Sequence, residues 1–111
     1  MIEKRDKDVT VKMINIMIDM WEEEAFNLSF TDKTHPSYIL VQKIADKNKD
    51  IVITTILKRL QKEFTFFAGV LYDILPLSEW PHFPKEVNGK ADEVTKIWIE
   101  WGYEEGYLKN D

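Results

Sequence analysis

His35 and Tyr38 are the residues whose types and spacing come closest to acid–base chemistry in this chain. A histidine titrates near neutral pH, but a general acid or base also needs a second convergent polar group and a pocket. An enzyme of this kind would add a carboxylate such as that of Glu24 to the pair. The sequence spacing places no second polar group beside them. A structural role accounts for both residues, with His35 capping a helix and Tyr38 packing beside it. We therefore expect a protein that is not an enzyme.

The patterns that bind metal ions are incomplete in this sequence. His35 and His82 are the only histidines, and neither belongs to an HExxH motif or another paired ligand spacing. The run at residues 46–50 begins like a calcium-binding loop, but Ile51 stands where that loop needs glycine and Leu57 where it needs glutamate. We expect neither a metal nor another cofactor.

The composition indicates one globular domain that covers residues 1–111. Four tryptophans, six phenylalanines and four tyrosines supply the bulk that disordered chains lack. Cysteine is absent, which excludes disulfides and thiolate catalysis and fits the cytoplasmic location that we expect. The N-terminal sequence is charged, and no run of about 18 apolar residues occurs, so we expect neither a secretory signal nor a membrane span.

The net charge of −5 is unevenly distributed along the chain. Acidic residues cluster at 19–24 and again at 92–105, whereas the middle of the chain is basic. An acidic whole argues against nonspecific nucleic-acid binding, whose affinity comes largely from neutralised phosphates. The basic face formed by Lys58, Arg59 and Lys62 nevertheless keeps a small nucleic-acid-associated protein open as an alternative.

Apolar spacing predicts an all-α fold, a single-domain irregular bundle of about five short helices. Residues 1–8 form a charged lead that we expect to fray, and the first helical stripe begins near Val9. The buried face of this helix is expected to comprise Met13, Ile14, Met17, Met20 and Trp21.

The second and third helices are expected to form an antiparallel, HEAT-like hairpin around the polar turn at residues 46–50. The first of them begins at Pro36, because a proline is tolerated in the first helical turn, and the other is capped by Asp50. Their buried faces are expected to comprise Tyr38, Val41, Ile44, Ala45, Val52, Ile56, Leu57, Leu60 and Phe64.

A fourth helix is expected to be capped by Thr65 and to end before Pro76, since the residue preceding a proline avoids helical angles. Its inward side chains are those of Phe67, Val70, Leu71 and Ile74. Residues 76–89 are rich in proline and are expected to form an ordered loop. The side chains expected to fix this loop to the body are those of Leu77, Trp80 and Phe83.

The last helix is expected to begin near Asn88 and to end where Gly102 or Gly106 provides a left-handed cap. Residues 108–111 are expected to be a tail. The core-facing residues of this helix are expected to be Val94, Ile97, Trp98 and Trp101.

Two blocks of the sequence resemble a known family. They are HPSYILVQKI at residues 35–44 and WIEWG at residues 98–102. They resemble the HPAYQQII-like and AWLxWG-like blocks of a family of small, uncharacterised bacterial helical proteins, and the similarity covers residues 21–107. The turn at residues 46–50 lacks the glycine usual in that family. The resemblance implies a helical fold and, because the family has no assigned activity, no chemistry.

These observations favour a small, cofactor-free protein–protein interaction module, such as an antitoxin, immunity, inhibitor or adaptor protein of a bacterium or phage. Acidic side chains would face a basic partner at the rim, and exposed aromatic side chains would anchor it. A homodimer is compatible with the same residues, and a cryptic enzyme around His35 and Tyr38 stays an alternative. The expected partner-binding residues are Glu22, Glu23, Glu24, Trp80, Tyr103, Glu104, Glu105 and Tyr107.

Overall fold

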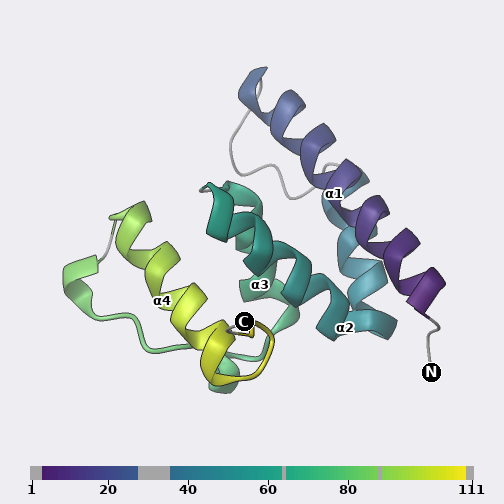
Figure 1. The fold of residues 1–111 in the computed structure, drawn as a ribbon. Coiled ribbons are helices and arrows are strands. Elements are labelled where there is room, and N and C mark those ends of the chain that lie inside the picture. The colour runs from purple at the N-terminus through teal and green to yellow at the C-terminus, as the bar shows by residue number, and fades with distance from the viewer. Residues whose placement is uncertain (1–3, 28–35, 64, 88, 110–111) are drawn as a thin grey trace.

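The structure is a computed structural model that describes residues 4–27, 36–63, 65–87 and 89–109. Within these residues every regular element is helical, which confirms the all-α fold. Figure 1 shows α2 between α1 at one edge of the molecule and α4 at the other. The α-helices are α1 (Lys4–Asn27), α2 (Pro36–Lys62), α3 (Gly69–Ile74) and α4 (Ala91–Glu104). The short 3₁₀ helices are η1 (Phe66–Ala68), η2 (Leu77–Glu79) and η3 (Lys85–Val87).

α1 and α2 differ from the predicted helices at their boundaries. α1 begins at Lys4, so helical structure extends into the segment expected to fray. α2 is one element where the sequence predicts two, but its backbone leaves helical angles at Asn48, with φ −131° and ψ 49°. Asn48 lies within the predicted polar turn, and α2 changes direction there (Figure 1). The expected break in the helical path is therefore present as a kink.

The face of α1 that packs against the body carries Ile14, Ile18 and Trp21, all of which are buried. The prediction placed Met13 and Met20 in this core, and that placement is wrong because both are exposed. The reason is that α1 has apolar residues on two sides and only one side is covered by the rest of the described chain. The buried side is centred on Ile18, which the sequence analysis left out.

Three aromatic rings join α1, α2 and η1 at the centre of the core. Trp21 lies 6.3 Å from Tyr38 and 5.3 Å from Phe67, measured between ring centroids. Tyr38 and Phe67 are also 5.3 Å apart, so the three rings contact one another pairwise. Most of the predicted inner face of α2 is confirmed around them, with buried side chains at Tyr38, Val41, Ala45, Val52, Ile56, Leu57 and Leu60. Ile44 is partly buried against this core, and Phe64 lies outside the described residues.

The start and end of the fourth predicted helix follow the local signals. Thr65 Oγ1 accepts a hydrogen bond from the Phe67 backbone N–H at 3.1 Å, so Thr65 caps this segment as expected. The chain then forms η1 followed by α3 rather than one regular helix. Leu75 is extended, with ψ 134°, directly before Pro76, which ends α3 where the proline predicts.

The proline-rich segment is held by two of the three predicted side chains. Trp80 Nε1 donates a hydrogen bond to the Leu75 carbonyl at 2.9 Å, and its ring packs edge-on against Tyr72 at 4.8 Å. Phe83 contacts Tyr72 as well, with ring centroids 5.9 Å apart. Leu77 was expected to share this role but is 74% exposed, because η2 is a surface turn that buries none of its residues.

The C-terminus of α4 is closed by Gly106, whose φ of 85° is the left-handed conformation that glycine adopts freely. Tyr107 N–H then returns to the Gly102 carbonyl at 2.9 Å. This turn buries Leu108 beside α4, so the expected tail at residues 108–111 does not begin at Leu108. Gly102 packs closely against Leu57, since a Cβ there would lie 2.7 Å from Leu57 Cδ1 and would force that side chain to shift.

Candidate functional site

The structure gives Tyr38 a structural role. Its hydroxyl is buried and donates a hydrogen bond to Asp73 Oδ2 at 2.6 Å. Burial first, and then the hydrogen bond and charge of Asp73, raise the pKa of Tyr38 well above its ordinary value. Tyr38 therefore stays protonated at neutral pH and ties α2 to α3. His35 and the side chain of Glu24, the other members of the predicted acid–base group, lie outside the described residues.

The described residues also provide no metal centre. His82 is exposed on the segment between η2 and η3. In the ranges that the structure describes, no three His, Asp or Glu side chains are grouped so that they could hold a metal ion. None of the helices in those ranges has an apolar stretch able to cross a membrane.

The acidic cluster of α1 contacts Arg59, one residue of the basic face of α2, where the two helices meet at the surface. Arg59 Nη2 lies 2.8 Å from both Asp19 Oδ1 and Glu22 Oε1, and its Nη1 donates to Asn15 Oδ1 at 3.3 Å. The nucleic-acid alternative assigned the Arg59 guanidinium to phosphate binding. In the structure two carboxylates of α1 already bind this group. Glu22, expected at a partner rim, holds α1 against α2. Glu23 remains exposed on the surface of α1.

The predicted aromatic anchors Trp80 and Tyr107 both have internal partners. Trp80 is held by Tyr72 and the Leu75 carbonyl, as described above. Tyr107 stacks on Trp101 with ring centroids 5.3 Å apart. Burial, and next the negative charges of Asp50 and two glutamates, raise the pKa of Tyr107 above its ordinary value. Both rings therefore stabilise the fold.

The remaining predicted partner-binding residues gather at the C-terminal end of α4. Tyr103 is partly exposed and its hydroxyl accepts a hydrogen bond from Gln61 Nε2 at 2.8 Å. Glu104 and Glu105 are exposed beside it. Figure 1 places this end of α4 far from the C-terminal end of α1, so the fold does not join the two acidic clusters into one surface.

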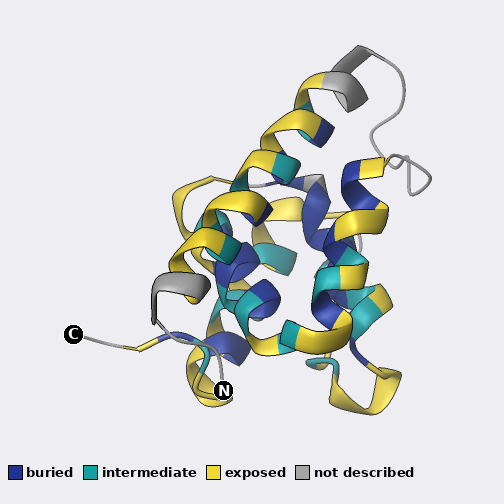
Figure 2. Cartoon of the chain, turned by 90° about the vertical axis from the view of Figure 1, so that its right-hand side faces the viewer, coloured by how far each residue is buried: buried dark blue, intermediate teal, exposed yellow. Residues whose placement is uncertain are grey.

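Four of the eight exposed large hydrophobic side chains among the described residues form a stripe along α1, which we call the outer face of α1. It is formed by Val9, Met13, Ile16 and Met20, whose side chains are 51%, 44%, 55% and 45% exposed. The spacing of these residues alternates between four and three positions, the repeat of a coiled-coil seam. Figure 2 shows the exposed side of α1 turned away from the body and its buried side facing inward.

The sequence contained a signal for this surface. Val9, Met13, Ile16 and Met20 form one apolar stripe, and Ile14, Ile18 and Trp21 belong to another on the opposite side of α1. A helix that is apolar on two sides is normally covered on both. Two separate apolar stripes on α1 therefore predict that the body covers one side of the helix and that the other side is left for a partner.

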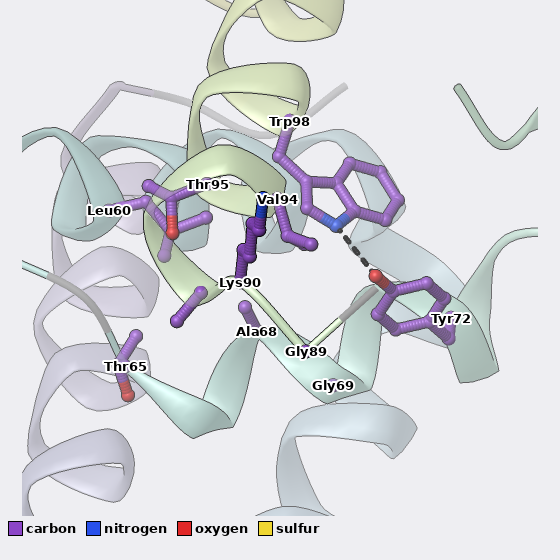
Figure 3. A pocket seen from close by; sticks show the side chains of 11 residues that line it. Leu60, Thr65, Ala68, Gly69, Tyr72, Gly89, Lys90, Val94, Thr95 and Trp98 are labelled. Carbon is purple, nitrogen blue, oxygen red and sulfur yellow. Dashed lines mark hydrogen bonds between the residues drawn. The ribbon is translucent and has the colours of Figure 1, made fainter. Parts of the chain in front are cut away.

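A pocket of about 340 Å³ lies between the start of α4, the end of α2 and the η1–α3 segment. Its wall is mostly apolar and includes Leu60, Ala68, Val94 and Trp98. Trp98 Nε1 donates to the Tyr72 hydroxyl at 3.2 Å along one side, as Figure 3 shows. Sequence reasoning missed this pocket because its walls come from distant segments of the chain.

Lys90, the residue before α4, and Thr95 within α4 are polar residues in this mostly apolar wall. Thr95 Oγ1 is buried and has no hydrogen-bond partner among the described residues. Lys90 is exposed and belongs to the same wall (Figure 3). The pocket is thus mainly apolar, with one cation in its wall and an unpaired hydroxyl oxygen buried behind its surface.

Comparisons with protein-family models, with curated proteins and with solved structures found no match to this chain. The outer face of α1 and the pocket beside α4 are therefore the two features of the described residues that bear on function.

Proposed function

We propose that this chain is a non-catalytic protein-interaction module of the cytoplasm that binds a helix of its partner along the outer face of α1. The observation that carries the proposal is the exposure of Val9, Met13, Ile16 and Met20 on one side of a helix. Exposed apolar stripes of this kind mark interaction sites, because water contact with them is unfavourable. We take the kinked α2 to act as the helical hairpin predicted from sequence. It supports α1 on the buried side of that helix.

The spacing of the outer face suits a helical partner in particular. Side chains that alternate every three and four residues pack as knobs into the holes of a facing helix. Met13 and Met20 are flexible and polarizable, which allows them to fit an imperfect partner surface. Completing the burial of a half-exposed side chain of this size contributes about 1 kcal/mol, so several together support a stable complex.

The charge at the C-terminal end of the outer face favours a partner with a basic residue there. Glu23 follows Met20 by three positions and is exposed, so it extends the stripe with a negative charge. Asp19 is also largely exposed although it contacts Arg59, with 66% of its side chain accessible. A basic side chain on the partner near this end of α1 would be complementary to both carboxylates.

A second copy of the chain is the other occupant that a specific observation favours. The spacing of the outer face reads the same in both directions, so an antiparallel copy would set Val9 against Met20 and Met13 against Ile16. The same pairing would bring the exposed Lys12 toward Asp19 of the other copy. Sedimentation velocity of the purified protein distinguishes this homodimer from binding to a different protein.

The test is quantitative capture from cells that express the chain at native level, with the wild type compared with the double variant Met13→Gln, Ile16→Gln. Glutamine keeps the helix and the net charge while removing the apolar contact. The control is Leu77→Gln, which removes an apolar residue elsewhere that is more exposed than either Met13 or Ile16. The proposal predicts that the wild type and Leu77→Gln both capture the same partner, which is either another protein or a second copy of this chain. The double variant is expected not to capture it.

Two results would contradict the proposal. One is a captured set that is the same for all three proteins while each sediments as a monomer. The other is retention that depends on Leu77 but not on Met13 and Ile16. Circular dichroism and thermal unfolding of the variants verify that each one is folded, since all the replaced side chains are substantially exposed.

A further inference from the structure

The sulfur atoms of the described residues all lie on α1. Cysteine is absent, so the thioethers of the methionines are the only sulfur atoms that an oxidant can attack. Met13 and Met20 are 44% and 45% exposed, whereas Met17 is partly buried and packs against the core. Met1 lies outside the described residues. The two most accessible methionines of the described chain therefore lie on one side of one helix.

Met13 and Met20 occupy equivalent positions on the outer face of α1. They are one heptad apart, so both lie in the coiled-coil seam that the proposed function requires, with Ile16 between them. Figure 2 shows that the exposed side of α1 is turned away from the body. An oxidant in solution therefore reaches both side chains while the face is free, and a bound partner helix covers both.

Oxidation of these side chains changes the chemistry of the outer face. A sulfoxide replaces a flexible, apolar thioether with a polar S–O group that accepts hydrogen bonds. A seam of apolar side chains offers this oxygen no donor, so burying it against a partner is unfavourable. In the free chain the same oxygen stays in water, because both side chains are substantially exposed. Oxidation at these positions thus opposes binding without opposing folding.

We propose that Met13 and Met20 are a reversible oxidation site at which a peroxide releases the partner from the outer face of α1. A lone pair of the thioether sulfur attacks one oxygen of hydrogen peroxide, so an S–O bond forms and the O–O bond breaks. The proton on the transferred oxygen passes to the departing hydroxide, which leaves as water. The sulfur is oxidised by two electrons and the peroxide is reduced. This inference rests on the proposed function, since the release requires a bound partner.

The first measurement is the order in which the methionines oxidise. The purified full chain is treated with hydrogen peroxide, and tandem mass spectrometry follows the sulfoxide fraction at each position. We expect Met13 and Met20 to oxidise several-fold faster than Met17, because exposure controls the rate. The chain that carries both sulfoxides is expected to keep the circular dichroism spectrum of the untreated chain. Oxidation of Met17 as fast as that of Met13 and Met20 would overturn the assignment.

The second measurement is capture by the oxidised chain. The immobilised chain is oxidised, freed of peroxide with catalase and incubated with a cell extract from which small-molecule reductants have been removed. The probe is the partner that the wild type captures and that the double variant Met13→Gln, Ile16→Gln loses. We expect the oxidised chain to retain about tenfold less of this partner than its own untreated sample.

Reduction of the sulfoxides is expected to restore capture. The oxidised chain is treated with methionine sulfoxide reductases A and B, which act on the two sulfoxide epimers, with dithiothreitol as the reductant. Each sulfoxide becomes a thioether and water while the dithiothreitol becomes a disulfide. Capture that stays low after complete reduction would mean that a different oxidised residue causes the loss.

Two leucine variants assign the effect to individual sulfur atoms. Met13→Leu, Met20→Leu keeps apolar side chains of similar size at the seam but cannot form sulfoxides there. Met17→Leu is the matched control, because it removes the partly buried sulfur instead. Each protein is compared with its own untreated sample. We expect peroxide to lower capture by the wild type and by Met17→Leu, and not by the double leucine variant.

The outcomes separate this inference from the proposed function. If the glutamine variant loses the partner while the chain with both sulfoxides keeps it, the docking surface stands and the oxidation site is wrong. Equal losses for the wild type and the double leucine variant after peroxide would also show that the site is wrong. If the glutamine variant loses neither a protein nor a second copy, the proposed function fails and this inference fails with it.

Discussion

Tyr38 and Asp73 are joined by a 2.6 Å hydrogen bond in which the buried Tyr38 hydroxyl is the donor. Because burial and Asp73 raise the pKa of Tyr38, the folded protein holds this proton more tightly than the unfolded chain does. The resulting stability is complete below the ordinary tyrosine pKa of about 10 and is lost as the pH rises above it, since only the unfolded chain then releases the proton. We expect the free energy of unfolding to fall steeply above about pH 10, as measured by urea unfolding at a series of pH values.

Tyr38→Phe isolates the contribution of this hydroxyl. The variant is expected to be about 2 kcal/mol less stable than the wild type at pH 7, because it loses a hydrogen bond to a charged group. The difference should narrow as the pH rises above about 10, since the variant has no Tyr38 proton to lose. Tyr103→Phe is the control, because its hydroxyl is near the surface and pairs with exposed Gln61. A constant difference between Tyr38→Phe and the wild type across this pH range would refute the coupling.

Gly102→Ala is expected to destabilise the protein by about 2 kcal/mol through overpacking. The added Cβ would lie 2.7 Å from Leu57 Cδ1 and 3.0 Å from Leu108 Cδ1, which forces both side chains to move. Gly69→Ala is the matched control, because its Cβ would meet nothing closer than the Tyr38 hydroxyl at 3.7 Å. Chemical denaturation should place Gly69→Ala at or above wild-type stability, and equal losses for both variants would contradict the packing at α4.

Thr95→Val and Thr55→Val are expected to change stability in opposite directions. Thr95→Val should raise the free energy of unfolding by about 1 kcal/mol, because a methyl group replaces an unsatisfied buried hydroxyl. Thr55→Val should lower it by a similar amount, because it leaves the Ile51 carbonyl without the side-chain hydrogen bond that it accepts at 2.7 Å. Differential scanning calorimetry provides the comparison, and a loss of stability in both variants would mean that Thr95 has a partner.

The features that could be predicted from sequence are those set by neighbouring residues. Thr65 caps the segment that follows it, Pro76 ends α3, and Gly106 closes α4 because each acts within one turn of the chain. The polar run around Asn48 likewise marks where α2 departs from helical angles. The HEAT-like hairpin stays a prediction.

The features that escaped prediction depend on contacts between distant segments. Which side of α1 is buried depends on α2, so the sequence shows the stripe with Met13 and the stripe with Ile18 but not which of the two is covered. Arg59 and Glu22 each fit an exposed site when taken alone, and only the fold brings them within 2.8 Å. Leu108 is buried because the turn at Gly106 folds it back on α4. Its position near the C-terminus had predicted a tail instead.

The candidate sites follow the same division. The outer face of α1 lies on one helix and is visible in the sequence as a second apolar stripe. The pocket at Thr95 is assembled from α2, η1, α3 and α4, so no local sequence pattern predicts it. The residues with recognisable chemical types, Tyr38 and Arg59, are instead occupied by internal partners.

Site-specific photo-crosslinking in living cells tests the docking surface most directly. In one variant a benzophenone amino acid replaces Ile16, which is 55% exposed at the middle of the outer face of α1. In a second variant of the same chain it replaces Leu77, which is 74% exposed and lies elsewhere. The account predicts one discrete adduct from position 16, to a partner or to a second copy, that disappears when Met13→Gln is added. An absence of adducts at position 16, or the same adducts from position 77, would contradict it.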